Sequence, residues 1–173
     1  MKKTLVLVFH PDLGGQSRAN KALAQTAAEI SDVTVRDEYA LYSDGAVDVA
    51  AEQQLVEEHD RIVLQFPLYW YSSPALLKEW EDKVLAYGWA YGPGGEALRG
   101  KEIMVATTAG GGTGEYRTKN NGATMDEVLS PYRMMARYTN AAWHKPFVVF
   151  NAMELDDDAL AAAAARYRET LLA

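Results

Sequence analysis

Three short segments of the chain contain residues whose types and spacing could hold a ligand. The first, residues 10–20, reads HPDLGGQSRAN and ends where a helical pattern begins. A helix N-terminus offers unpaired N–H groups and the positive end of a dipole, so it suits a phosphate group. The candidate ligands are His10, Ser17, Arg18, Ala19 and Asn20. The spacing matches neither a Walker loop nor G-x-G-x-x-G, and taken alone it slightly favours ordinary capping by Ser17 with His10 as a turn residue.

The second segment, residues 66–74, reads FPLYWYSSP and follows a predicted strand. Three aromatic residues in a row cannot all turn into one core. They could instead wall a flat apolar ligand, with backbone amides at its polar edge. The candidates are Leu68, Tyr69, Trp70 and Tyr71. For any single ring, a place in the core or in a subunit contact explains the sequence equally well.

The third segment contains Thr107, Thr108, Ala109 and Gly110, followed by two more glycines. Glycine has no Cβ, so the backbone can approach a ligand closely there. A flexible turn at the end of a strand would explain this loop if it stood alone. The functional interpretation depends on all three segments meeting at one place.

Other kinds of site find little support in the residues. The chain has no cysteine, which excludes disulfides, thiolate metal sites and cysteine nucleophiles. His10, His59 and His144 are far apart and show no metal-ligand spacing. No G-x-S-x-G motif marks a hydrolase serine.

The elements that must position the three segments alternate along the chain. Short apolar runs predict strands over residues 4–9, 33–36, 61–66, 102–108 and 147–151, and helical spacing predicts helices over 18–30, 48–59, 75–85, 125–137 and 156–172. Ser17 is expected to cap the first of these helices. The alternation predicts one α/β domain over residues 1–173, with a flavodoxin-like doubly wound parallel sheet of five strands in the order 2-1-3-4-5 and helices on both faces. Ligands of this architecture bind beyond the carboxyl ends of the strands, where all three segments would lie.

The composition of the chain disfavours some kinds of binding partner. The chain has 173 residues, 49% hydrophobic and 24% charged, which is ordinary globular usage. Its net charge of −7 disfavours nucleic acid as a partner, because phosphate-backbone binding needs a basic face. No apolar stretch approaches the roughly 20 residues of a membrane span, and no cleavable leader is evident, so we expect a soluble, cytoplasmic protein.

Longer motifs resemble a known family. His10-Pro11 after the first strand, PLYWY at 67–71, TTAGG at 107–111 and GWAYGPGGEALRGK at 88–101 resemble the NAD(P)H:quinone oxidoreductase (DT-diaphorase-like) family. The last motif is most similar to the small bacterial branch that contains the ancillary flavoproteins of glutathione-gated potassium-efflux systems. The resemblance covers nearly the whole chain.

The resemblance implies a flavin cofactor, FMN rather than FAD, because the chain lacks the extra segment of the FAD-binding relatives. His10 and residues 17–20 would hold the phosphate and ribityl end, residues 68–71 the ring, and residues 107–110 would pass near N5 and O4. The family's usual Thr-Thr-Gly-Gly has Ala109 as its third residue here. The implied mechanism is ping-pong: NADH or NADPH gives a hydride to flavin N5 and leaves, and a quinone then receives it on the same face. Tyr116 matches a tyrosine that assists charge transfer, whereas Gly122 stands where larger relatives have a histidine, so solvent would supply protons.

The resemblance also implies a homodimer whose sites receive residues from both subunits. The aromatic residues 87–91 fit such an interface, and a surface loop packed on its own sheet is the alternative. A regulatory role remains a second functional hypothesis, with a potassium-efflux membrane protein as partner that would bring the chain to the inner face of the membrane. A flavodoxin-like electron carrier is less favoured, because the Thr/Ser-rich phosphate loop of flavodoxin is absent.

Overall fold

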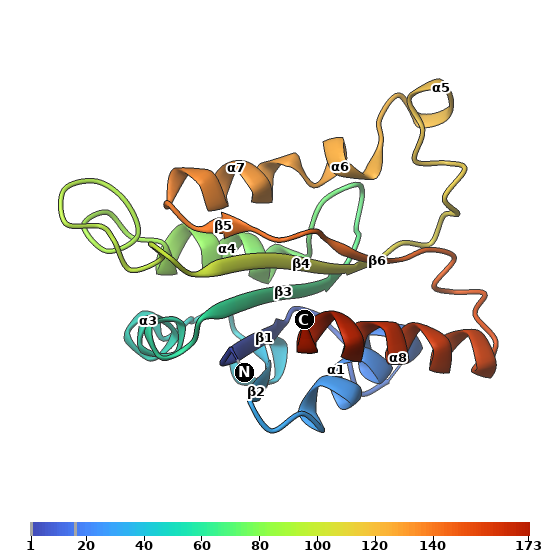
Figure 1. Ribbon diagram of the computed structural model, residues 1–173, viewed down its shortest axis with the longest axis horizontal. Helices are drawn as coiled ribbons and strands as arrows, with labels where there is room; N and C mark the ends of the chain where they lie inside the picture. Colours follow the sequence, from blue (N-terminus) through green and yellow to red (C-terminus); the bar gives the residue numbers. More distant parts are fainter. Residues whose placement is uncertain (1, 16) are drawn as a thin grey trace.

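One parallel sheet organises the chain in the computed structural model, which describes residues 2–15 and 17–173 (Figure 1). Its strands are β1 (Thr4–Val8), β2 (Val33–Asp37), β3 (Arg61–Pro67), β4 (Glu102–Thr108), β5 (Ala142–Trp143) and β6 (Phe147–Val149). The order is β2-β1-β3-β4-β5, with β6 also paired to β4. All pairings are parallel, as the buried, β-branched strands with helical connections require.

Helices cover both faces of this sheet (Figure 1). They are α1 (Arg18–Ala28), α2 (Glu38–Leu41), α3 (Val49–Glu58), α4 (Ala75–Val84), α5 (Thr118–Asn121), α6 (Met125–Val128), α7 (Ser130–Tyr138) and α8 (Asp157–Leu172). Helices α1 and α8 pack together on one face, whereas α4, α6 and α7 lie on the other. Alternate residues of each strand divide between the two cores: Leu5 and Leu7 of β1 face α4, and Val6 and Val8 face α1.

The predicted strand order is confirmed, with one correction at its edge. The expected fifth strand, residues 147–151, is the shorter β6, and β5, a two-residue strand outside the expected range, also pairs with β4, so this edge is divided between two short strands. Pro146 lies between them, and proline cannot donate a ladder hydrogen bond. The expected helix over 125–137 is likewise divided into α6 and α7 at Leu129, because Pro131 has no N–H to continue a helix and starts a new one instead.

Smaller differences concern the helix ends and two short helices. Helix α1 ends at Ala28 rather than at residue 30, and α2 and α5 were not expected. The aspartates Asp48 and Asp156 cap α3 and α8 by accepting hydrogen bonds from the N–H groups of Ala51 and Ala159. No helix within the described part of the chain has the length and apolar character needed to cross a membrane.

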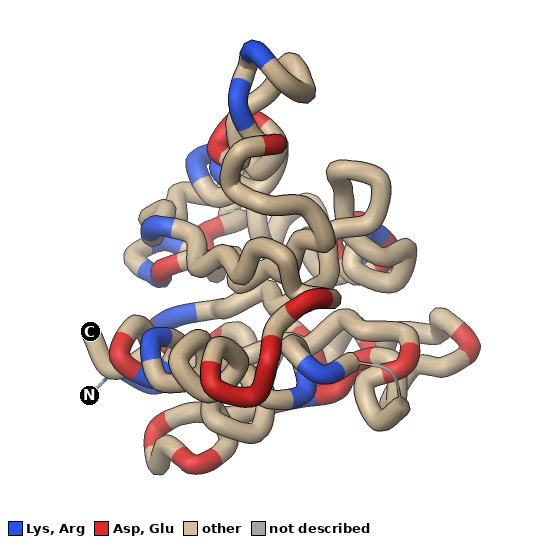
Figure 2. Tube along the Cα trace, turned by 90° about the vertical axis from the view of Figure 1, so that its right-hand side faces the viewer, with Lys and Arg blue, Asp and Glu red and all other residues tan. Residues whose placement is uncertain are grey.

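The carboxyl ends of the parallel strands lie together at one edge, on the right in Figure 1. The loops that follow β1, β3, β4 and β6 therefore meet there, before α1, α4, α5 and α8. Figure 2 looks onto this edge and shows Lys and Arg in separate short segments rather than gathered in one basic surface. Any positive potential at this edge must therefore come from a few particular groups.

Candidate functional site

A pocket of about 450 Å³ lies at this edge of the sheet. It is lined by His10, Ser17, Arg18, Ala19, Asn20, Pro67, Tyr69, Thr108, Ala152 and Met153. All five residues of the predicted phosphate turn are among them, together with one residue each from the predicted aromatic wall and the glycine loop. Residues far apart in the sequence are thus brought together where the topology rule placed them.

The start of α1 forms one end of the pocket. Ser17 occupies the N-cap position and is buried, but its side chain makes no capping hydrogen bond, contrary to the expected cap. Its backbone is extended, as is usual at an N-cap position. The Arg18 guanidinium donates to the Leu155 carbonyl oxygen at 2.8 Å and to the Asp157 carboxylate at 2.6 Å, which links α1 to the first residue of α8 and to the loop before it. The helix start is therefore tied to the start of α8.

His10 lies beside this helix start in a single protonation state. The backbone N–H of Asp12 donates to His10 Nδ1 at 3.0 Å, so in the neutral ring Nε2 carries the hydrogen. Burial lowers the pKa of His10 below its ordinary value of 6.5, against the opposing influence of Asp12 and Asp37. At neutral pH His10 is consequently an uncharged donor that can offer Nε2–H to a ligand oxygen.

The predicted aromatic wall is a tight turn. Tyr69 and Ser72 exchange backbone hydrogen bonds at 2.9 Å in both directions, and Leu68 N–H donates to the Thr108 carbonyl oxygen at 2.8 Å. Trp70 and Tyr71 at the tip have φ angles of 48° and 61°, as in a type I′ turn. That conformation costs non-glycine residues about 1–2 kcal/mol each, so the turn stores strain next to the pocket.

Only part of this wall faces the pocket. Tyr69 lines it, whereas Leu68 packs against the core and Trp70 is 94% exposed at the tip of the turn. Tyr71 lies edge-on to Tyr116, with ring centroids 6.5 Å apart. Of the four candidates only the Tyr69 side chain lines the pocket, because a turn with two left-handed residues directs neighbouring side chains apart; that residues 68–71 contact a ligand stays a prediction.

The glycine loop behaves in the same way. Thr108 lines the pocket, but Thr107 faces the interior and donates to the Phe66 carbonyl oxygen at 2.8 Å. The reason is the alternation of side chains along a strand. Ala109 is buried, with its N–H bonded to the Val149 carbonyl oxygen, and Gly110 follows in open space. Ala109 and Gly110 are thus adjacent to the pocket without lining it.

Tyr116 belongs to an aromatic cluster beside the wall. Its ring lies 5.5 Å from that of Phe150 as well as near Tyr71. Burial raises the pKa of Tyr116, and the neighbouring Tyr71 and Glu115 raise it further. The hydroxyl therefore keeps its hydrogen at neutral pH and is able to donate it.

Two features of the site were missed from the sequence. Ala152 and Met153, in the loop before α8, form a side of the pocket although only three loops were expected to do so. The topology rule itself contains the signal, because the last strand also ends at this edge. The second feature is a buried chain of hydrogen bonds from Tyr167 through Gln65 to Asn20 behind the pocket. A glutamine within the apolar run RIVLQFP was its only trace in the sequence.

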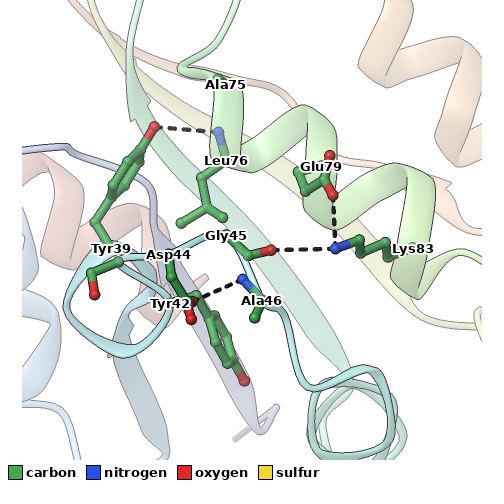
Figure 3. A pocket seen from close by; sticks show the side chains of 10 residues that line it. Tyr39, Tyr42, Asp44, Gly45, Ala46, Ala75, Leu76, Glu79 and Lys83 are labelled. Carbon is green, nitrogen blue, oxygen red and sulfur yellow. Dashed lines mark hydrogen bonds and ion pairs between the residues drawn. The ribbon is translucent and has the colours of Figure 1, made fainter.

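A second pocket, of about 560 Å³, lies between residues 42–46 and α4 (Figure 3). There the Tyr39 hydroxyl accepts a hydrogen bond from Leu76 N–H at 3.2 Å and so caps α4, whose N-cap residue Pro74 makes no side-chain cap. Lys83 pairs with Glu79 at 2.8 Å and donates to the Gly45 carbonyl oxygen. Helix α2 thus contacts the start of α4, the helix that follows the wall turn in the sequence.

The pocket at the sheet edge combines two environments. The helix start, His10 and Arg18 suit an anion, whereas Pro67, Tyr69 and Met153 offer apolar and aromatic surface. Across the described residues, 2–15 and 17–173, no group of three or more His, Asp or Glu could hold a metal ion. The site is suited to an organic anion with a flat ring.

Proteins similar to this chain are found among curated sequences. The Bacillus subtilis protein named "Uncharacterized NAD(P)H oxidoreductase YrkL" is 41% identical over 172 residues, covering 99% of this chain and 98% of its own length. KefF of Salmonella arizonae, named as the ancillary protein of a glutathione-regulated potassium-efflux system, is 43% identical over 169 residues, covering 98% and 95%.

Solved structures are similar as well. One described as a thermophilic tryptophan halogenase from Streptomycin violaceusniger has a TM-score of 0.95 and 48% identity, with 98% of both chains covered. General stress protein 14 of Treponema denticola, solved in complex with FMN, has a TM-score of 0.89 and 38% identity, covering 98% of this chain and 96% of its own. An NADPH-quinone reductase from P. pentosaceus follows with a TM-score of 0.86 and 29% identity, covering 97% and 96%.

These relatives share one fold but are named for different activities. The similarity therefore establishes the family of this chain and not a particular activity. The family model described as the flavodoxin-like fold matches residues 2–171. This match agrees with the strand order, with the helices on both faces and with the pocket at the carboxyl ends of the strands. The chain belongs to the flavodoxin-like fold family.

Proposed function

We propose that this chain is an FMN-dependent NAD(P)H:quinone oxidoreductase with a ping-pong mechanism. The observation that supports this most directly is the single pocket in which a helix start and His10 lie within reach of Tyr69 and Pro67. An anion site joined to an aromatic surface matches the two ends of FMN. The FMN complex of the Treponema denticola relative and the oxidoreductase name of YrkL point the same way.

The residues divide into two groups under this proposal. Ser17, the N–H groups at the start of α1 and His10 Nε2–H would bind the phosphate and ribityl end. Tyr69, Pro67 and the backbone of residues 68–71 and 107–110 would border the ring. Bound FMN supplies two-electron chemistry, with a hydride taken from NADH or NADPH and delivered to a quinone. Tyr116, whose hydroxyl keeps its hydrogen, would donate a hydrogen bond as charge develops in the transferring complex.

An absorbance spectrum of the purified protein tests this proposal, repeated after anaerobic addition of NADH or NADPH. We expect a flavin band that bleaches within seconds and returns when a simple benzoquinone is added. Double-reciprocal plots at several quinone concentrations should then give the parallel lines of ping-pong kinetics. A protein that shows no flavin band after incubation with FMN would contradict the proposal.

We further propose that the active form is a homodimer. Large apolar side chains are exposed together on α7 and the loop after α4: Tyr87 is 68%, Met134 66% and Tyr138 69% exposed. The rings of Tyr87, Tyr91 and Tyr138 contact one another in sequence, with centroids 5.7 and 5.4 Å apart. A second copy covering this surface would remove it from water and would bring the aromatic loop to a neighbouring site.

A regulatory function is the second candidate, and the 43% identity to KefF over 169 residues is what favours it. In this alternative the chain would bind a potassium-efflux membrane protein and activate it, with or without turnover. Potassium efflux from cells that express such a channel, measured with and without this chain, distinguishes the two. Unchanged efflux together with rapid quinone reduction would favour the enzyme.

A further inference from the structure

Gln65 is a polar residue in a place that favours an apolar one. It lies on β3, fully buried, in register with Val8 of β1 and Ala106 of β4. Its side chain is on the sheet face that packs against α1 and α8, beside the apolar Val63. A buried amide is costly unless its donors and acceptor are paired, so its presence needs a compensating arrangement.

That arrangement is a chain of hydrogen bonds through four elements. The Tyr167 hydroxyl of α8 donates to Gln65 Oε1 at 3.1 Å, and Gln65 Nε2 donates to the Asn20 carbonyl oxygen of α1 at 2.9 Å. Asn20 Nδ2 in turn donates to Thr108 Oγ1 of β4 at 2.9 Å. Every member is buried, so the bonds are shielded from competing water.

This chain of hydrogen bonds ends at two residues that line the pocket. Asn20 and Thr108 both line it, and the hydrogen bond between them fixes the first turn of α1 relative to the end of β4. Because Thr108 Oγ1 already accepts from Asn20, its own hydrogen is available to an acceptor in the pocket, and no described residue takes it. The hydrogen-bond chain therefore sets both the position of the start of α1 and the direction of the Thr108 hydroxyl.

We propose that Gln65 and Tyr167 are positioning residues that set the phosphate-binding turn, so that the pocket selects FMN over unphosphorylated riboflavin. This inference rests on the proposed FMN site and adds to it two residues that do not line the pocket. The aromatic end of the pocket lies outside the hydrogen-bond chain, so ring binding is independent of it.

The test compares the affinity of flavin-free protein for FMN and for riboflavin, measured by quenching of flavin fluorescence. In Tyr167→Phe, which keeps the ring contact with Phe147 at 4.9 Å, we expect FMN to bind about fivefold more weakly and riboflavin to change less than twofold. Gln65→Met, which removes both links, should weaken FMN binding further. Tyr42→Phe is the matched control. It removes a hydrogen bond to Glu52 on the opposite face of the sheet, where Tyr42 packs against the core that contains α4, and it should leave the ratio of FMN to riboflavin affinity unchanged.

The possible results distinguish failure of the positioning role from failure of the proposed FMN-dependent function. If the wild type prefers FMN and Tyr167→Phe keeps that full preference, the positioning role is overturned while the FMN site stands. Equal loss of FMN and riboflavin affinity in the variants overturns it too, because general destabilisation then explains the effect. A wild-type protein that binds neither flavin overturns the proposed function, and the inference with it.

Discussion

Burial sets the chemical state of the side chains around the pocket before any ligand arrives. His10 is held neutral with its hydrogen on Nε2, because burial lowers its pKa and a backbone N–H occupies Nδ1. Tyr116 is held protonated by a raised pKa. Both therefore act as hydrogen-bond donors at neutral pH rather than as charges.

Tyr116→Phe should lower turnover with a benzoquinone about 10- to 100-fold, because it removes the hydroxyl proposed to assist charge transfer. Flavin affinity should change less than twofold, since the ring keeps its contacts with Tyr71 and Phe150. Stopped-flow bleaching by NADH and steady-state kinetics measure the two halves separately. Tyr42→Phe, at a residue that does not line the site pocket, should retain wild-type turnover, and equal kinetics in both variants would refute the role of Tyr116.

Glu38 predicts how stability depends on pH. Glu38 is buried, and one of its carboxylate oxygens has no hydrogen-bond partner among the described residues. Arg36 forms ion pairs with both Glu38 and Glu52. Burial and then the nearby Glu52 carboxylate raise the pKa of Glu38 to about 7, with a smaller contribution from Asp37. The folded protein therefore keeps a proton that the unfolded chain, with an ordinary pKa near 4.5, releases.

The free energy of unfolding should consequently fall as pH rises from about 4.5 to about 7 and level off above that interval. Burial also raises the pKa of Glu81 to about 7, which adds a fall of the same sign. Urea unfolding across this pH range measures the effect. Glu38→Gln should flatten part of the slope, whereas Glu154→Gln, at an exposed position, should preserve it.

Among the elements, the wall turn shows how the fold tolerates strain beside its pocket. Trp70 adopts a left-handed conformation with its side chain almost fully exposed, so the packing it contributes is small. Strain that persists at a ligand pocket suggests that the tip serves the ligand rather than the fold.

Trp70→Asn should stabilise the protein, because asparagine tolerates this conformation better. We expect a gain of about 1 kcal/mol and a rise in Tm of about 2–4 °C, with lower flavin affinity or turnover. Calorimetry and flavin titration measure the two effects. Met153→Asn, another exposed apolar position but without a positive φ, should give no such gain in Tm.

The elements also show which features can be read from a sequence. Alternating apolar runs and helical spacing predict the strand order, and the topology rule then places His10, Ser17, Tyr69 and Thr108 at one edge. The type I′ turn could not be predicted, because Trp-Tyr lacks the glycine or asparagine that marks such turns. The pairing of Gln65 with Tyr167 could not be predicted either, because it joins residues 102 positions apart through tertiary packing.

At the scale of the whole molecule, the exposed apolar surface formed by Tyr87, Met134 and Tyr138 suggests how copies associate. Tyr138→Glu would place a charge in the ring contacts of that surface, and burying this charge in an interface is costly. We expect this variant to elute as a monomer with light scattering detection, where the wild type elutes as a dimer. Leu41→Glu, exposed on α2, should remain dimeric; a monomeric wild type would contradict the proposed dimer.

The divided strand at the end of the sheet limits how such copies can join. An outer strand with a continuous row of free amides can template pairing with a foreign chain and start a fibril. Here that row consists of two residues in β5 and three in β6, separated by His144, Lys145 and Pro146. Each of these two strands is too short to pair with a strand of another molecule, so this edge of the sheet does not favour fibril growth. Association is then left to side-chain contacts, which can separate again without unfolding.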